Sequence, residues 1–153
     1  CGAITHTHHR GAPREGLVRV AVAQTSHVQS IGIDTEMVMG PPLAACLAKR
    51  IASAQELELA GAMPPAVFLT LIFSLKESVY KCLYPLTQTF LGFHDVSLVA
   101  CDAGLVSLRL ERAAGTFEPL SEFTLSYEID TDAVHTKMVL DANFVTVGPT
   151  FNL

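Results

Sequence analysis

Two short segments of the sequence combine residues that could do chemistry, and the first is Ile-Gly-Ile-Asp-Thr-Glu at positions 31–36. Asp34 and Glu36 are two residues apart, so on a β-strand both carboxylates would lie on the same face. Two neighbouring carboxylates repel unless a cation or a proton lies between them. Gly32 on that face has no side chain and would let a ligand approach the backbone.

The second segment, Phe-Ser-Leu-Lys-Glu-Ser-Val-Tyr-Lys at positions 73–81, would place a carboxylate between two lysines on a helix. Glu77 and Lys81 are four residues apart and share one helix face, while Lys76 and Tyr80 share the adjoining face. The carboxylate could hold a metal ion, and the lysines could meet phosphate oxygens as point charges. This combination is typical of a site for a metal ion and a polyphosphate.

Each segment taken alone also has an ordinary structural explanation. An Asp-x-Glu pair on a strand is usually a solvated face, and a Glu/Lys pair on a helix is usually a salt bridge of small energy. Taken together, the three carboxylates without a supporting thiolate favour Mg²⁺, or Mn²⁺, over zinc. A second cluster, Thr-His-Thr-His-His at positions 5–9, could bind a transition metal, but no cysteine is near it and unliganded histidines are the favoured interpretation.

A strand must position the first segment and a helix the second, and the patterns around them predict an α+β fold. Ser53 and Glu56 have the form of a capping box, and Asp102 to Gly104 predicts a hairpin turn. Residues 1–12 are expected to form a short apolar start and then a polar loop. Strands are expected near 18–24, 30–36, 95–101, 105–112, 123–130 and 133–140, and helices at 43–51, 53–60 and about 65–83.

Composition bounds the class of protein. The 153 residues suffice for one compact domain, and 50% hydrophobic with 16% charged residues indicates a packed core. The net charge of −5 argues against a nucleic-acid partner. No apolar run reaches the length of a membrane span. The four cysteines are far apart, so we expect reduced thiols and a cytoplasmic protein.

In combination, the two segments resemble the 4′-phosphopantetheinyl transferases, specifically the larger type that activates siderophore and antibiotic synthetases. That family shows a G-I-D-x-E strand followed by a helix with (F/W)-(S/A)-x-K-E-S-x-x-K, and residues 32–36 and 73–81 match both. Lys-Cys-Leu-Tyr-Pro at 81–85 and Phe-His-Asp at 93–95 are similar to the enterobactin-synthetase-associated branch. Gly-Ala-Ile-Thr-His at 2–6 resembles the family's histidine motif, with alanine in place of the usual serine.

The resemblance implies a pseudo-twofold pair of α+β halves, each with an antiparallel sheet packed on helices, and with coenzyme A bound between them. Residues 1–29 would then be the end of a first subdomain that is mostly missing, and residues 30–153 the second, metal-binding subdomain. The implied reaction moves phosphopantetheine from coenzyme A to a serine of an apo acyl or peptidyl carrier protein and releases 3′,5′-ADP. A monomer is expected if the full chain is present.

The resemblance also implies roles for individual residues. Asp34, Glu36 and Glu77 would bind Mg²⁺ or Mn²⁺, and Glu77, directly or through a water, would accept the serine proton. Lys81 would act with Glu77 in catalysis. Contacts with coenzyme A would come from Thr5, His6, Gly32, Lys76, Tyr80 and Lys81. Within this set the two lysines would bind the coenzyme A phosphates, His6 the 3′-phosphate and Tyr80 the pantetheine channel.

Three other interpretations stay open. The chain could be a truncated member of the family that binds a carrier protein without turnover. It could be a different Mg²⁺-dependent phosphoryl-transfer or hydrolytic enzyme, although the sequence has no P-loop. The small trimeric acyl-carrier synthases share G-I-D and K-E, but they begin near that strand and generally lack the histidine motif.

Overall fold

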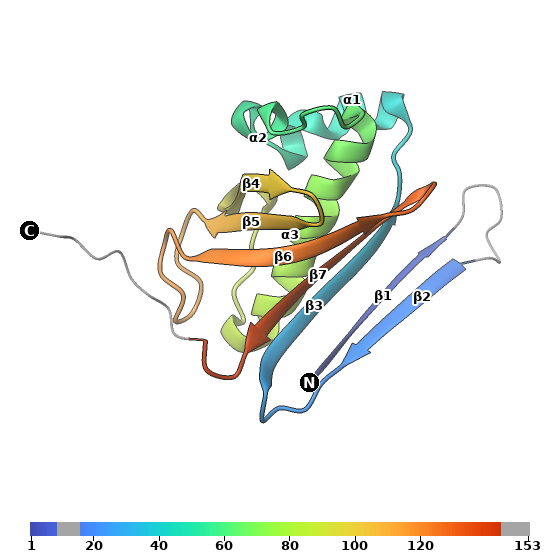
Figure 1. The fold of residues 1–153 in the computed structure, drawn as a ribbon. Helices are drawn as coiled ribbons and strands as arrows, with labels where there is room; N and C mark the ends of the chain where they lie inside the picture. Colours follow the sequence, from blue (N-terminus) through green and yellow to red (C-terminus); the bar gives the residue numbers. More distant parts are fainter. Residues whose placement is uncertain (9–15, 145–153) are drawn as a thin grey trace, which may run out of the picture.

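The computed structural model describes residues 1–8 and 16–144. A five-stranded antiparallel sheet carries one long helix on one face, and a separate two-stranded hairpin lies alongside its edge strand (Figure 1). The strands are β1 (Gly2–His8), β2 (Gly16–Val22), β3 (Val28–Met37), β4 (Val96–Asp102), β5 (Leu105–Leu110), β6 (Glu122–Ile129) and β7 (Ala133–Asp141), and the helices are α1 (Pro41–Ile51), α2 (Ala54–Glu58), α3 (Pro65–Thr87) and the short 3₁₀ turn η1 (Phe93–Asp95). The fold is the predicted α+β class.

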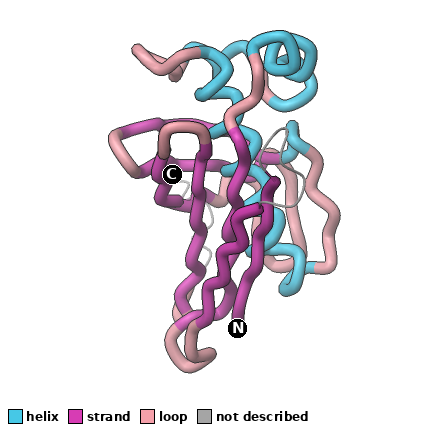
Figure 2. The backbone as a smooth tube through the Cα atoms, turned by 90° about the vertical axis from the view of Figure 1, so that its right-hand side faces the viewer, coloured by secondary structure: helices cyan, strands magenta, loops and turns pink. Residues whose placement is uncertain are grey.

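The sheet has the order β3-β7-β6-β5-β4, with every neighbouring pair antiparallel. The last four strands form a meander. The final strand, β7, pairs with β3, which precedes all three α-helices in the sequence. The β1–β2 hairpin lies beside β3 in both orientations of the molecule (Figures 1 and 2). Because β3 is an edge strand of the sheet, its free edge is open to contact from the hairpin.

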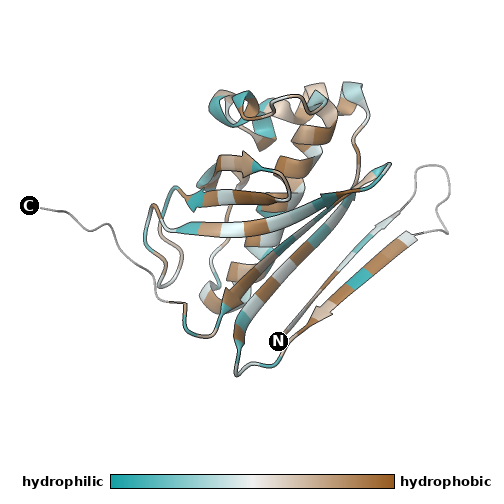
Figure 3. Ribbon diagram, viewed as in Figure 1, coloured by the Kyte–Doolittle hydropathy of each residue, from teal (hydrophilic) through white to brown (hydrophobic). Residues whose placement is uncertain are grey.

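Helix α3 supplies the centre of the core. The apolar residues Phe68, Leu71, Ile72, Leu75 and Val79 recur at roughly helical spacing, and all are at most 1% exposed. The inner faces of β4 to β7 pack on the same cluster, and hydrophobic residues follow the helix along its length (Figure 3). Burial of this stripe fixes the rotation of α3 and therefore which of its polar residues face β3.

Gly32 lies where α3 crosses β3, and the expectation that it admits a ligand is wrong. A Cβ atom added there would lie 1.9 Å from the carbonyl oxygen of Ser78 and 2.7 Å from the amide nitrogen of Cys82. The backbone of the helix fills the space that the missing side chain leaves. Gly32 therefore sets the close approach of the helix to the strand.

Several local predictions are confirmed. Ser53 and Glu56 form the capping box of α2, with Glu56 N–H bonded to Ser53 Oγ at 3.2 Å and Ser53 N–H to Glu56 Oε2 at 2.8 Å. The turn between β4 and β5 contains Gly104 with φ of +80°, a conformation that favours glycine. The proline pair at the start of α1 occupies the first helical turn, where an N–H group would lack an intrahelical partner anyway.

Two boundaries differ from the prediction. Residues 2–8 form strand β1 where a polar loop was expected, because β2 pairs with them along their full length, from Gly2 opposite Val22 to His8 opposite Gly16. Helix α3 runs to Thr87, past Pro85. A proline in the last turn removes one backbone hydrogen bond, while the left-handed residue Gln88, with its N–H bonded to the Tyr84 carbonyl, closes the helix.

The two faces of the hairpin differ in their surroundings. Thr5 on the face toward β3 is 3% exposed. The opposite face is apolar and open, with exposed fractions of 63% for Ile4, 59% for Val18, 64% for Val20 and 80% for Val22. Strand β2 thus has its three valines on one face, and in the described structure they stay largely exposed. No helix in the described part of the chain is long and apolar enough to cross a membrane.

Candidate functional site

Three elements that are far apart in the sequence meet at Asp34 of β3. Lys81 of α3 lies with Nζ 2.6 Å from Asp34 Oδ1, and Asp34 is 3% exposed. Thr5 of β1 donates a hydrogen bond from Oγ1 to the same carboxylate oxygen at 3.3 Å. The Thr5 hydroxyl also accepts a hydrogen bond from the backbone N–H of Thr35 at 3.2 Å. The hairpin is therefore tied to β3 at the predicted site.

Glu36 and Glu77 lie close enough to Asp34 for their charges to interact. Burial, followed by the negative charge of Asp34, raises the pKa of Glu36 to about 7, against an opposing effect of Lys81. Burial and the Asp34 charge also raise the pKa of Glu77, and Lys81 again opposes the shift. Three crowded carboxylates and one ammonium group thus share a partly buried region, which favours binding of an additional cation.

The donor chemistry of this region fits a hard divalent cation. Asp34 Oδ2 is buried and, among the residues that the structure describes, has no hydrogen-bond partner. An orphaned carboxylate oxygen beside two further carboxylates would be satisfied by Mg²⁺ or Mn²⁺. Within residues 1–8 and 16–144, however, no three acidic, histidine or cysteine side chains already converge at coordinating distance. The cation in contact with Asp34 is Lys81.

Lys76 is not placed as predicted for phosphate binding. Its side chain is 2% exposed, and Nζ donates to Glu56 Oε1 at 2.7 Å, to the Ile51 carbonyl at 2.9 Å and to the Phe93 carbonyl at 2.7 Å. An ammonium group has three N–H donors, and all three are used here. Burial lowers the pKa of Lys76, while its hydrogen bond to Glu56 acts in the opposite direction. Lys76 therefore joins helices α1, α2 and α3 internally.

The two residues of the predicted histidine motif point in opposite directions, as alternation along a strand requires. Thr5 faces Asp34, whereas the exposed His6 lies on the open face of the hairpin, directly across from Val18. The structure thus brings Thr5 to the carboxylates and leaves His6 on the other side of β1. His9, from the alternative histidine cluster, lies outside the described residues.

A pocket of about 550 Å³ opens beside the carboxylates, between α3, the end of α1 and the segment that follows α3. Glu77 and Tyr80 line it, and the Tyr80 ring lies 5.7 Å from that of Phe90, edge to face. Sequence reasoning identified Tyr80 but missed Phe90, Leu91 and Phe93 as lining residues. The sequence could have indicated them, because three apolar residues follow the helix and the last of them begins the Phe-His-Asp motif at 93–95. The other lining residues are Arg50, Lys76, Gly92 and Val96.

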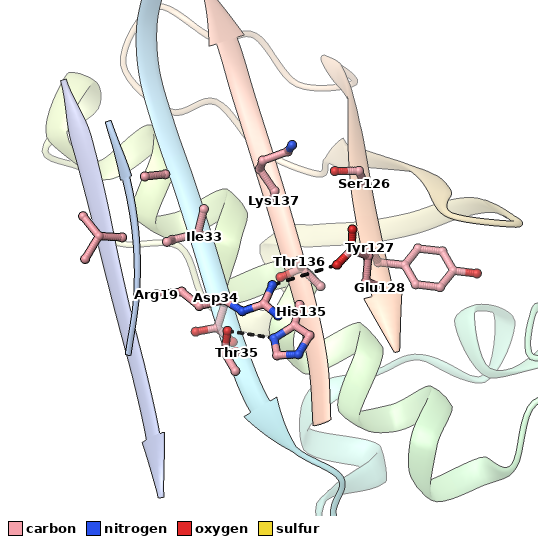
Figure 4. Close-up of a pocket in the computed structure, with 12 residues that line it drawn as sticks. Arg19, Ile33, Asp34, Thr35, Ser126, Tyr127, Glu128, His135, Thr136 and Lys137 are labelled. Carbon is pink, nitrogen blue, oxygen red and sulfur yellow. Dashed lines mark hydrogen bonds and ion pairs between the residues drawn. The ribbon is translucent and has the colours of Figure 1, made fainter. Parts of the chain in front are cut away.

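The opposite face of β3 carries a smaller pocket of about 180 Å³, lined mainly by polar residues (Figure 4). There His135, 5% exposed, links Thr35 and Asp130, with Nδ1 3.1 Å from Thr35 Oγ1 and Nε2 2.9 Å from Asp130 Oδ2. These buried contacts give His135 a structural role. The hydrogen bonds hold β3 to β7 directly behind the two acidic residues.

Comparison with known proteins assigns this arrangement to a family. The sequence profile of the 4′-phosphopantetheinyl transferase superfamily matches residues 30–136. Among curated proteins, the chain is 35% identical over 114 residues to the 4′-phosphopantetheinyl transferase Svp of Streptomyces mobaraensis, covering 71% of this chain and 43% of that protein. It is 36% identical over 84 residues to enterobactin synthase component D of Salmonella typhi, covering 54% of this chain and 36% of that protein. The chain therefore spans less than half the length of these relatives.

Solved structures share the fold at lower identity. Holo-[acyl-carrier-protein] synthase of Thermotoga maritima superposes with a TM-score of 0.57 at 23% identity, over 74% of this chain and 64% of that one. The Bacillus anthracis synthase, solved with coenzyme A (3′,5′-ADP), superposes with a TM-score of 0.52 at 21% identity, over 75% of this chain and 97% of that one. With the acidic strand, the lysine-bearing helix and the profile match in agreement, the chain belongs to the 4′-phosphopantetheinyl transferase superfamily.

Proposed function

We propose that the protein carrying this chain transfers 4′-phosphopantetheine from coenzyme A to a serine hydroxyl of an apo acyl or peptidyl carrier protein. The observation that carries the proposal is the buried Asp34, which faces the helix of Glu77 and Lys81 and has one oxygen without a hydrogen-bond partner among the described residues. This arrangement, in a chain of the transferase superfamily, suits a pyrophosphate substrate held with a divalent cation. The similarity to Svp and to enterobactin synthase component D favours carrier proteins of siderophore and antibiotic synthetases.

In the proposed reaction, the serine oxygen forms a bond to the β-phosphorus of coenzyme A, and the bond from that phosphorus to the bridging oxygen breaks. The products are the phosphopantetheinyl carrier protein and 3′,5′-ADP, which keeps the bridging oxygen. The serine proton goes to Glu77, directly or through a water. Lys81 would bind a phosphate oxygen.

Asp34, Glu36 and Glu77 would hold Mg²⁺, or Mn²⁺, through their carboxylate oxygens. When bound, this ion neutralises charge on the pyrophosphate oxygens. Thr5 would keep Asp34 in position through its hydrogen bond to Oδ1. The proposal thus retains the three predicted ligands and gives Thr5 a role in orienting one of them rather than in binding the nucleotide.

The aromatic pocket beside Glu77 suits the pantetheine arm. Its lining is largely apolar and lies next to the carboxylates, so a substrate with its pyrophosphate at Asp34 could extend into it past Tyr80 and Phe90. His6 stays the proposed contact for the 3′-phosphate, from the exposed face of β1. These two assignments place the two ends of coenzyme A on different sides of the carboxylate cluster.

The open face of the hairpin supports the proposed division into residues 1–29 and 30–153. Strands β1 and β2 form a sheet of their own, and their apolar residues have no core to join within the described structure. We propose that they complete a first subdomain. The four cysteines are unpaired, which supports a reducing, cytoplasmic setting.

The test is transfer of a fluorescent coenzyme A analogue to an apo carrier protein by the full-length protein that contains this chain, with Mg²⁺ and with chelator. Labelling that requires the metal ion is the expected result. A carrier protein that binds but is never labelled would support the alternative of a non-catalytic family member. A control carrier with its acceptor serine replaced by alanine should stay unlabelled.

A further inference from the structure

The positive charge that faces Asp34 belongs to Lys81, whose side chain is partly exposed. Lys81 Nζ is 2.6 Å from Asp34 Oδ1, but the Lys81 side chain is 32% exposed, whereas that of Asp34 is 3% exposed. The lysine reaches the buried carboxylate from the solvent side through a flexible four-carbon chain. The second oxygen, Oδ2, is buried without a hydrogen-bond partner among the described residues.

We propose that Lys81 changes partner when substrate binds. In the free protein its ammonium group neutralises Asp34. When coenzyme A and a divalent cation bind, the ammonium moves to the pyrophosphate and leaves the Asp34 carboxylate to the cation. This inference rests on the proposed function, and it explains why three carboxylates are present while no three donors converge in the described part of the chain.

Repulsion between like charges favours such an exchange. A divalent cation bound to Asp34 would share that carboxylate with the ammonium group of Lys81, and their like charges repel. If the metal ion binds alone, Lys81 has to leave Asp34 without gaining an anion. If coenzyme A is present, a phosphate oxygen provides a charge-assisted replacement. Thr5 can keep its hydrogen bond to Asp34 in both states because a neutral hydroxyl does not repel the cation.

The exchange predicts a coupling between metal ion and coenzyme A. Each should raise the affinity for the other, and part of that gain should come from Lys81. If Lys81 kept one position throughout, replacing it would change the affinity for the metal ion by the same factor with and without coenzyme A. If Lys81 changes partner, its replacement changes the two affinities by different factors. The ratio of the metal affinity with coenzyme A to that without it therefore distinguishes the two cases.

The experiment measures Mn²⁺ binding to the full-length protein by electron paramagnetic resonance, without carrier protein and with or without coenzyme A. For Lys81→Met, we expect Mn²⁺ alone to bind about threefold to tenfold more tightly than to the unsubstituted protein. The gain on adding coenzyme A should shrink by a similar factor. Lys49→Met removes the same charge at an exposed position of α1 and should match the unsubstituted protein.

Unchanged or weaker Mn²⁺ binding by Lys81→Met without coenzyme A would overturn the exchange, as would an equal change in both conditions. Absence of Mn²⁺ binding by the unsubstituted protein would also overturn it. The labelling assay on the same unsubstituted preparation decides the proposed function separately. If the carrier protein is labelled, the transferase assignment stands whatever the Mn²⁺ result. If Mn²⁺ and coenzyme A both bind but the carrier protein is not labelled, only the transferase assignment is contradicted.

Discussion

At the scale of single residues, burial and mutual repulsion govern the three carboxylates. Asp34 has two partners on one oxygen and none on the other among the described residues, while Glu36 and Glu77 have raised pKa values because burial and the Asp34 charge disfavour their ionised forms. Asp34 is therefore open to a cation at its second oxygen, and Glu36 and Glu77 are poised to gain a cation or a proton. Two predictions follow from that balance.

Glu77→Gln should lower the rate of transfer by at least about a hundredfold, because it removes a proposed base and a proposed metal ligand together. The melting temperature of the metal-free protein should stay the same or rise, since one repelling charge is lost. Carrier-labelling rates and thermal unfolding measure the two effects. Near-normal labelling would remove Glu77 from the mechanism.

Glu36 makes the metal-free protein sensitive to pH. Its folded pKa of about 7 lies above the ordinary value of 4.5, so the folded state binds the proton more tightly. The resulting stability is fully present below pH 4.5 and is lost as the pH rises through 7. For this half-buried group we expect about 1–2 kcal/mol. Urea unfolding across that range should show a flatter profile for Glu36→Gln, and an identical profile would contradict the assignment.

At the scale of elements, the approach of α3 to β3 depends on Gly32, and the attachment of α2 depends on the buried pair of Lys76 and Glu56. Glu56 accepts hydrogen bonds from the N–H groups of Ser53 and Leu98, so it connects α2 to β4 as well as to α3. These contacts hold the helix that carries Glu77 and Lys81 against the acidic strand. Both can be tested by substitution.

Gly32→Ala should destabilise the protein by about 3 kcal/mol, because the added methyl group would overlap the backbone of α3 at Ser78 and Cys82. Gly92→Ala is a suitable control, because its Cβ would lie 3.5 Å from Asp95 Oδ2, an ordinary contact. Denaturant unfolding of both variants gives the comparison. Equal stabilities would mean that the helix does not approach β3 this closely.

Lys76→Met should lower the free energy of unfolding by about 3 kcal/mol, because it leaves Glu56 as a buried charge without its cation. At a temperature where the variant is folded, the KM for coenzyme A should change less than in Lys81→Met. This comparison separates a structural lysine from one that binds phosphate. A large rise in KM with unchanged stability would restore the sequence-based expectation for Lys76.

At the scale of the whole molecule, the described structure combines a filled core around α3 with a hairpin whose outer face is apolar and open. Contiguous exposed apolar surface of this kind indicates an interaction surface or promotes aggregation. The face belongs to the part of the chain that the proposed domain division assigns to a first subdomain. Its behaviour in isolation therefore tests that division.

Residues 1–153 prepared alone should self-associate through this face, and the double substitution Val18→Lys, Val20→Lys should reduce the association. Light scattering after size-exclusion chromatography and binding of an apolar dye would report it. Leu105→Lys, a change from apolar to charged at an exposed position in β5, is the control and should have little effect. A monomer that binds no dye would count against a missing first subdomain.

The sequence by itself determined the α+β class, most element positions and the core stripe of α3, because these depend on local periodicity and capping. It also predicted a site at Asp34, Glu36, Glu77 and Lys81, since paired motifs of chemically demanding residues are informative without coordinates. The tertiary structure brings Asp34 and Lys81 together, at 2.6 Å.

Only the tertiary structure decided which neighbour each side chain meets. Periodicity put Lys76 and Gly32 on plausible faces but could not show that Glu56 and two carbonyl groups use all the donors of Lys76, or that helix backbone fills the space at Gly32. Strand β1 was missed because its stability comes from pairing with β2. The residues between these two strands lie outside the described structure. Contacts between distant segments carry no local signal, so the attachment of Thr5 to Asp34 emerged only from the fold.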